Sequence, residues 1–182
     1  EQALPITVDR LAAELTRLHA LGLIDSGSCI YLVDDGSSDC TWSLICEFAA
    51  SDKPVAGIKL SRNHGHQYAL YAGLMEADGD VLISLDADLQ DDIAAIEDML
   101  RLFLAGKQVV YGVRDDRSSD SLFKRLSARG HYWLSRKLGI ETVPNHADFR
   151  LMSRCAVEML REYREAKSYL RGGRKRRGEG KG

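Results

Sequence analysis

A short apolar run, residues 81–85, ends in two carboxylates one residue apart, and this feature constrains the fold most strongly. The run reads Val-Leu-Ile-Ser-Leu, which is too apolar for a surface loop, so we expect a buried strand. Asp86 and Asp88 follow it directly, and Gln90 comes two residues later. Side chains at i and i+2 of an extended segment point the same way, so oxygen atoms of Asp86, Asp88 and Gln90 can converge on one hard cation. The run therefore predicts a divalent-cation site with open coordination positions.

Apolar segments alternate with segments of helical periodicity along the whole chain. Apolar residues three or four positions apart over residues 4–21 predict an amphipathic helix. Further helices are expected at residues 40–50, 66–76, 93–104 and 153–165, and strands at residues 29–33, 55–60, 81–85 and 109–113. This alternation predicts an α/β fold with a mostly parallel sheet and helices on both faces.

Polar side chains follow each expected strand. They are Asp34 and Asp35, then Arg62 and Asn63, then Asp86 and Asp88, then Arg114. Ligands of such sheets bind outside the carboxyl ends of the strands, so we expect these residues to form one site. Asp34 and Asp35 lie in a turn-forming sequence. Their carboxylates either only stabilise the turn or accept hydrogen bonds from the N–H groups of a nucleobase. His64 and His66 are interpreted as loop donors or structural histidines rather than metal ligands.

Composition narrows the class of protein. A chain of 182 residues suffices for one α/β domain, and a net charge of −2 argues against a general nucleic-acid binder. Four cysteines without a Cys-x-x-Cys pair indicate reduced thiols rather than a zinc site. We expect no signal peptide, and the sequence contains no apolar run of about 18 residues that could span a bilayer. We expect a domain over residues 1–172 and a basic, glycine-rich, mobile tail over residues 173–182.

A basic segment follows the last expected strand of the sheet. Residues 114–137 hold seven basic residues against three acidic ones, interleaved with large apolar side chains. The pattern predicts a basic amphipathic helix over residues 118–138. A solvated helix face is the simpler interpretation, but beside an acidic metal site the helix is better suited to receive an anion or a membrane surface.

Five stretches together resemble the family-two glycosyltransferases of the GT-A fold. Within that family they are similar to the polyprenyl-phosphate sugar transferases, relatives of dolichol-phosphate mannose synthase and of the bactoprenol glucosyltransferases. The stretches are residues 33–39 (VDDGSSD), 60–67 (LSRNHGHQ), 84–91 (SLDADLQD), 110–114 (VYGVR) and 147–152 (ADFRLM). Family members begin with an apolar strand ending in Pro-x-Tyr-Asn-Glu, so the resemblance implies that this first strand is missing here.

The resemblance also implies a reaction and a set of roles. The reaction is inverting transfer of a hexose from a UDP- or GDP-linked sugar to a polyprenyl phosphate, by a cytoplasmic protein peripheral to the inner membrane face. Asp34, Asp35 and Asp86 would bind the nucleotide, and Asp86, Asp88 and Gln90 would bind Mg²⁺ or Mn²⁺. The residues expected at the acceptor phosphate and reacting centre are Arg114, Lys124, Arg125 and Asp148.

Two other functions remain open from the sequence. A nucleotide-sugar-binding remnant without the first strand would bind the donor and transfer nothing. A haloacid-dehalogenase-like phosphatase also places Asp-x-Asp after an apolar strand, but it normally has Thr or Val where this chain has Gln90. No nucleic-acid partner is expected, and the oligomeric state, a homo-oligomer included, is left open.

Overall fold

The structure is a computed structural model that describes residues 2–88, 90–112 and 148–173. Its elements are, in order, α1 (Leu4–Ala20), β1 (Ile30–Asp34), α2 (Thr41–Ala49), β2 (Val55–Lys59), α3 (His66–Glu76), β3 (Val81–Ser84), α4 (Ala95–Leu104), β4 (Val109–Tyr111), β5 (Arg150–Ser153) and α6 (Arg154–Gly173). Each of them except β5 matches an expected helix or strand. The expected α/β fold class is therefore confirmed.

The described strands form two groups. β1 and β2 pair in parallel, from Ile30 opposite Val55 to Asp34 opposite Lys59. β5 lies between β3 and β4 and is antiparallel to both, so β3 and β4 run in the same direction. Sequence patterning misses β5 because it is four residues long and α6 begins at the next residue. Ser153 closes the strand, and its Oγ accepts a hydrogen bond from the N–H of Ala156 in the first turn of α6.

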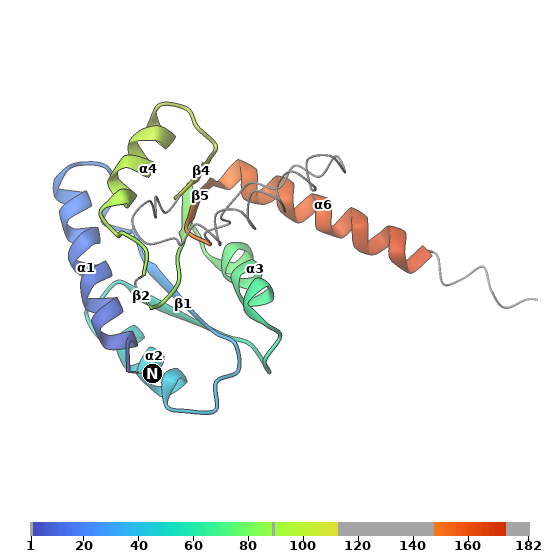
Figure 1. Cartoon of the computed structure of the whole chain (residues 1–182), viewed down its shortest axis with the longest axis horizontal. Helices are drawn as coiled ribbons and strands as arrows, with labels where there is room; N and C mark the ends of the chain where they lie inside the picture. Colours follow the sequence, from blue (N-terminus) through green and yellow to red (C-terminus); the bar gives the residue numbers. More distant parts are fainter. Residues whose placement is uncertain (1, 89, 113–147, 174–182) are drawn as a thin grey trace, which may run out of the picture.

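Helices cover both faces of the strands, as expected (Figure 1). α1, α2 and α4 pack on one face, and α3 and α6 pack on the other. The alternation of side chains along β3 produces this division, because Val81 and Ile83 join the α1–α4 cluster while Leu82 joins the α3–α6 cluster. The buried residues of α1 are Leu4, Thr7, Val8, Leu11 and Leu18.

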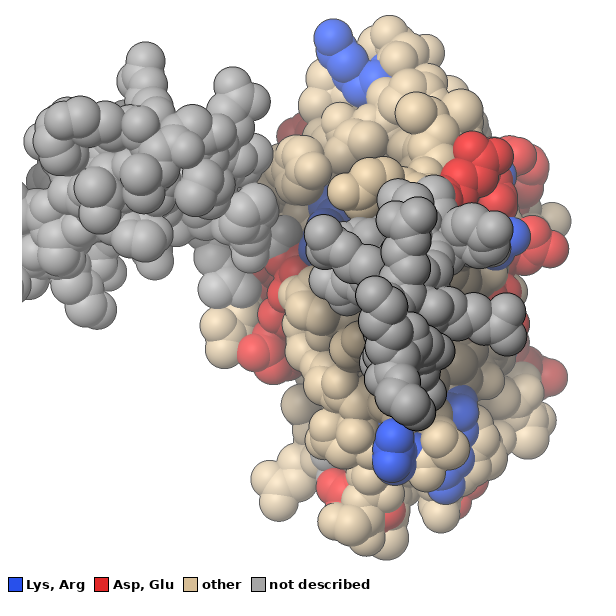
Figure 2. All heavy atoms as spheres, turned by 90° about the vertical axis from the view of Figure 1, so that its right-hand side faces the viewer, with Lys and Arg blue, Asp and Glu red and all other residues tan. Residues whose placement is uncertain are grey.

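α6 runs past its expected end near residue 165 and projects away from the strands (Figure 1). The expected basic helix at residues 118–138 and most of the expected tail lie outside the described residues. Within the described ranges, no helix has both the length and the apolar character needed to cross a bilayer. Figure 2 shows acidic and basic side chains interspersed on the described part of one face of the molecule.

Candidate functional site

Asp34 ends β1 at the carboxyl edge of the parallel pair. Its backbone carbonyl accepts the N–H of Leu60, which ties the ends of β1 and β2 together. The side chain is only 2% exposed, and its Oδ1 accepts the N–H of Ser37 at 3.1 Å. Among the described residues, none donates a hydrogen bond to its buried Oδ2. A buried carboxylate oxygen without a donor is costly, so this atom is suited to accept a hydrogen bond from a ligand.

Asp35 has different partners from its neighbour. One of its carboxylate oxygens accepts the N–H of His64 at 2.7 Å, and the other accepts the N–H of Gly65 at 2.8 Å. Gly36 follows with a φ of 73°, and a Cβ there would lie 2.6 Å from the carbonyl carbon of Arg62. The loop after β1 therefore packs directly on the loop after β2. In this position Asp35 holds the segment that leads into α3.

Asp148 is the centre of a polar cluster. Its Oδ2 lies 2.7 Å from Nε2 of His66, and its Oδ1 accepts hydrogen bonds from Arg150 at 2.9 Å and Gln67 at 3.5 Å. Ser84, the last residue of β3, donates to the backbone carbonyl of Asp148 at 2.6 Å. Side chains from α3 and β5 thus hold the carboxylate of Asp148, and Ser84 of β3 holds its backbone.

Asp86 joins the same cluster through His66, whose Nε2 lies 4.0 Å from Asp86 Oδ1. One ligand atom each from His66, Asp86 and Asp148 lies within 4.8 Å of the others. Partial burial raises the pKa of Asp86, and the negative charges of Asp148, Asp88 and Asp91 act in the same direction, while His66 opposes them. Two carboxylate oxygens and an imidazole nitrogen are donors that a divalent ion such as Mn²⁺ accepts, so this group fits a cation.

Asp88 lies at the turn that follows β3. The extended conformation that the sequence predicts for this stretch ends at Ser84, because Ala87 and Asp88 form a turn. Asp88 Oδ1 accepts the N–H of Gln90 at 3.1 Å, and the side chain is exposed. Asp86 belongs to the three-residue group of possible ligand atoms, and Asp88 lies outside this group, so the structure does not bring Asp86 and Asp88 together as expected. The roles of Asp88 and Gln90 as ligands stay predictions.

His66, Gln67, Ser84 and Arg150 are members of the cluster that the sequence did not identify as site residues, and His66, interpreted there as a loop donor or structural histidine, lies within the group of possible cation ligands. His66 begins α3 immediately after the polar segment that follows β2, a position that marks it as a residue of the carboxyl edge. Arg150 lies two residues after Asp148, and the side-chain period of a strand would place both on one side once β5 is recognised. Arg114, Lys124 and Arg125 lie outside the described residues, so their expected roles stay predictions.

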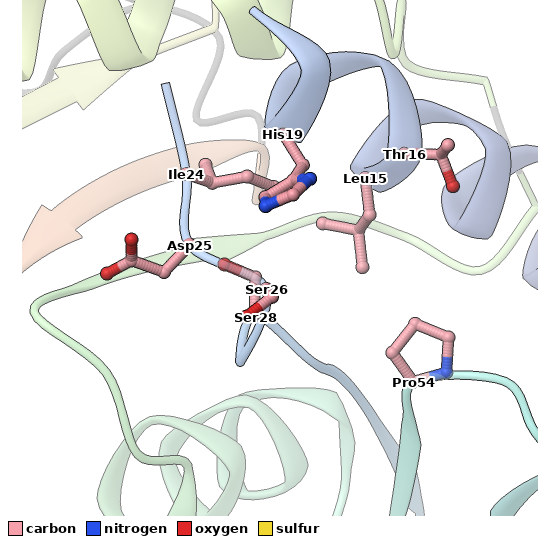
Figure 3. A pocket seen from close by; sticks show the side chains of 8 residues that line it. All are labelled: Leu15, Thr16, His19, Ile24, Asp25, Ser26, Ser28 and Pro54. Carbon is pink, nitrogen blue, oxygen red and sulfur yellow. The ribbon is translucent and has the colours of Figure 1, made fainter. Parts of the chain in front are cut away.

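A separate hollow lies at the opposite edge of the parallel pair (Figure 3). Its lining residues are Leu15, Thr16, His19, Ile24, Asp25, Ser26, Ser28 and Pro54. Ser28 and Pro54 precede β1 and β2, so this hollow is at the amino ends of these strands. It shares no residue with the cluster around Asp148.

Comparison with known proteins identifies close relatives. The chain is 51% identical over 152 residues to "Uncharacterized glycosyltransferase YkoT" of Bacillus subtilis (strain 168), covering 82% of this chain and 45% of that protein. It is 40% identical over 144 residues to "Bactoprenol glucosyl transferase" of Shigella phage SfV, covering 79% of this chain and 47% of that protein. The chain thus spans about half the length of these curated relatives.

The model of one protein family, "Glycosyl transferase family 2", matches residues 1–161. This match includes the turn after β1, the Asp86–Asp88 segment and the Asp148 cluster. It agrees with the resemblance seen in the sequence motifs. The chain belongs to glycosyl transferase family 2.

Proposed function

We propose that this chain contains the catalytic site of an inverting, metal-dependent glycosyltransferase. The donor is a UDP- or GDP-linked hexose, and the acceptor is a polyprenyl phosphate at the cytoplasmic face of the membrane. The observation that carries the proposal is the convergence of Asp86, Asp148 and His66 on one small volume at the carboxyl edge of the strands. Family membership and the name of the bactoprenol glucosyl transferase relative support the choice of reaction and acceptor.

Asp34 is the proposed contact for the nucleobase. Its buried Oδ2 accepts no hydrogen bond from a described residue, and a nucleobase N–H would supply the missing donor. Asp35 is proposed to act with it indirectly, because its own oxygens already accept two backbone N–H groups. In this proposal Asp34 binds the nucleobase, and Asp35 positions the segment that leads into α3.

Asp86 is proposed to hold a divalent cation together with His66 and Asp148, and with Asp88 and Gln90 as further candidates from the sequence. A bound Mg²⁺ or Mn²⁺ supplies positive charge that stabilises the leaving diphosphate. Asp86 is partly exposed, at 43% of its side chain, so a nucleotide can reach it. The hydrogen bond of Asp148 with His66 and its ion pair with Arg150 restrict its rotamers, which keeps this carboxylate fixed at the site.

The acceptor requires little activation in this proposal. A phosphate monoester has a second pKa of about 6, so it is already a nucleophile at neutral pH. The protein therefore has to position two anions and neutralise the leaving group, rather than provide a strong general base. The expected acceptor contacts Arg114, Lys124 and Arg125 are part of this proposal.

Thermal unfolding with UDP-, GDP- and dTDP-hexoses, each with and without Mn²⁺, tests the donor site. A ligand at about 100 times its dissociation constant stabilises the protein by about 2.7 kcal/mol, which shifts the Tm of a domain of this size by about 5–10 °C. The shift should require Mn²⁺ and should disappear in Asp86→Asn. Asp52→Asn, an exposed change in the loop before β2, is the matched control and should shift like the unmodified chain.

Transfer of labelled hexose to a polyprenyl phosphate in detergent micelles tests the reaction itself. Transfer with Mn²⁺, lost in Asp86→Asn and retained in Asp52→Asn, is the expected result. Donor binding without transfer would instead identify a binding remnant. A cooperatively folded protein with no Mn²⁺-dependent response to any nucleotide sugar would refute the metal-dependent site.

A further inference from the structure

Thr7 is a buried polar residue in the first turns of α1, only 1% exposed. Its Oγ1 lies 2.7 Å from the carbonyl oxygen of Ala87 and 2.9 Å from that of Ala3. A hydroxyl group has a single proton to donate. The carbonyl of Ala3 already accepts the backbone N–H of Thr7 at 3.0 Å, and the contact with Ala87 is the shorter one. We therefore assign the hydroxyl proton of Thr7 to the hydrogen bond with the carbonyl oxygen of Ala87, which lies 80 positions away in the sequence.

Ala87 is the residue between the two carboxylates of the Asp86–Asp88 segment, which we call the acidic loop (residues 85–88). β3 ends at Ser84, so pairing with β5 no longer holds the backbone there. Ala87 and Asp88 form an exposed turn after this point. A turn without strand pairing needs another contact on its backbone to keep one conformation.

α1 provides a rigid support for such an anchor. Thr7 lies on the same buried face as Leu4, Val8 and Leu11, and Val8 is completely buried. Ala87, in contrast, is exposed. The hydrogen bond thus connects a well-packed helix to an exposed loop.

We propose that Thr7 is a positioning residue that holds the carbonyl of Ala87 and so fixes the directions of Asp86 and Asp88. Its effect on cation binding rests on the function proposed above, whereas its effect on the loop backbone does not. Because an intramolecular hydrogen bond contributes about 0.5–1.5 kcal/mol, its loss should weaken cation binding by about two- to tenfold.

Two substitutions separate the hydroxyl from the shape of the side chain. Thr7→Val keeps the branched shape and removes the hydroxyl, and Thr7→Ser keeps the hydroxyl. Thr16→Val is the matched control, because Thr16 lies on the same helix and donates to the carbonyl of Ala12 at 3.0 Å, but is exposed and belongs to no acidic loop. All variants are compared at a temperature where thermal unfolding shows each to be folded.

Two measurements on these variants give the test. Amide hydrogen exchange of Ala87 and Asp88, read by NMR without metal, should be faster in Thr7→Val and unchanged in Thr16→Val. Mn²⁺ affinity, titrated by electron paramagnetic resonance, should fall about two- to tenfold in Thr7→Val. Thr7→Ser should restore both values.

The outcomes distinguish the two proposals. Unchanged exchange in Thr7→Val, or a Thr7→Ser variant as impaired as Thr7→Val, would overturn the positioning role. Faster exchange in Thr7→Val with unchanged Mn²⁺ affinity would overturn the link between the hydroxyl and cation binding. If the unmodified chain binds no Mn²⁺ but exchange is still faster in Thr7→Val, the proposed metal-dependent function is refuted. The positioning of the acidic loop by Thr7 is then still supported.

Discussion

The Nε2 atom of His66 lies 2.7 Å from Oδ2 of Asp148, although 82 positions separate the two residues in the sequence. The contact joins the first turn of α3 to Asp148, which lies two residues before the start of β5. The same nitrogen is 4.0 Å from Asp86, so one imidazole faces both carboxylates of the candidate cation site. His66 is therefore the residue whose removal should perturb this site most directly.

His66→Ala should lower Mn²⁺ affinity by about tenfold or more, since loss of a ligand or of its supporting hydrogen bond commonly has an effect of this size. Electron paramagnetic resonance titration of Mn²⁺ measures it. His64→Ala is the control, because His64 is exposed and its ring packs near Tyr68, at 6.2 Å between centroids. Equal Mn²⁺ affinity in His66→Ala and in the unmodified chain would contradict the assignment.

Asp34 and Asp35 should respond in opposite ways to amide substitution. Asp34→Asn removes the charge of a buried carboxylate whose Oδ2 accepts no hydrogen bond from the part of the chain that the structure describes, so we expect loss of nucleotide binding with little loss of stability. Asp35→Asn replaces an oxygen that accepts a backbone N–H by an amide that cannot accept it, which should lower the free energy of unfolding by about 1–3 kcal/mol. Urea unfolding and nucleotide titration of both variants check this, and matching behaviour of the pair would refute the division of roles.

Much of this fold follows from local patterns in the sequence. Helices α1 and α4 are predictable because their apolar residues recur three or four positions apart, and β1 and β2 because they are short apolar runs bounded by turn residues. β5 is not, because its stability comes from pairing with β3 and β4, which are distant in sequence, and local propensity says little about a strand of four residues. The partners of Asp148 on α3 and β3 are also distant in the sequence, so local patterns do not reveal them.

Only part of the candidate site is predictable from the sequence. The position of Asp34 and Asp86 at the strand ends is predictable from the rule that ligands bind at the carboxyl edge. The contact of Asp35 with the amides before α3 is not predictable, because it depends on how two loops pack. The contact of His66 with Asp148 is not predictable either, because it depends on the pairing of β5 with β3.

Gly36→Ala tests the packing of those two loops. Gly36 has a φ of 73°, and an added Cβ would lie 2.6 Å from the carbonyl carbon of Arg62 and 2.7 Å from the amide nitrogen of Asn63. We expect a loss of about 1–3 kcal/mol in the free energy of unfolding beyond the cost of the backbone conformation itself. Gly22→Ala is the matched control, since Gly22 has a φ of 67° with no atom within 4 Å of the added Cβ. Urea unfolding should show the larger loss for Gly36→Ala, and equal losses would show that the loops can move apart.

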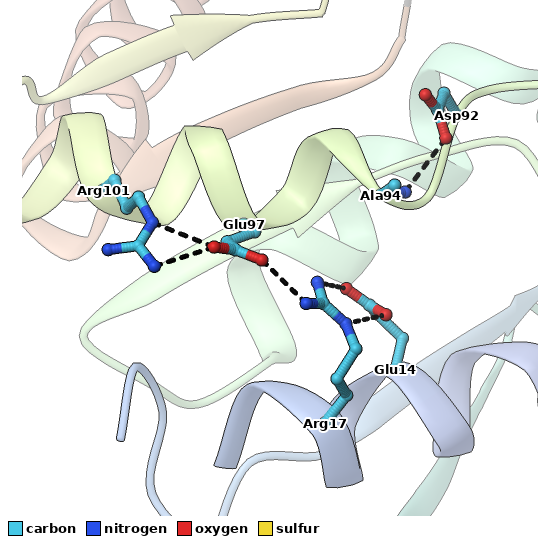
Figure 4. Close-up of polar contacts among 6 residues, drawn as sticks. All are labelled: Glu14, Arg17, Asp92, Ala94, Glu97 and Arg101. Atoms are coloured by element: carbon cyan, nitrogen blue, oxygen red, sulfur yellow. Dashed lines mark hydrogen bonds and ion pairs between the residues drawn. The ribbon is translucent and has the colours of Figure 1, made fainter. Parts of the chain in front are cut away.

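The last prediction concerns Glu97, which links α1 to α4 (Figure 4). Its carboxylate accepts hydrogen bonds from Arg17 at 2.7 Å and from Arg101 at 2.7 and 3.0 Å. Arg17, followed by Arg101, lowers the pKa of Glu97 below its ordinary value of 4.5. Between the lowered pKa and 4.5 the unfolded chain therefore binds more protons than the folded one, so the contribution of Glu97 to stability is complete above this window and is lost as the pH falls through it.

Glu97→Gln should consequently flatten the fall in stability below pH 4.5, while Glu47→Gln, an exposed change on α2, should leave the slope unchanged. Urea unfolding from pH 7 to pH 3 measures the two slopes. High salt should reduce the difference between Glu97→Gln and the unmodified chain, because Arg17 and Arg101 are exposed enough for their charges to be screened. Parallel curves for Glu97→Gln and the unmodified chain would mean that the arginines do not depress this carboxyl group, and that apolar packing alone holds α1 against α4.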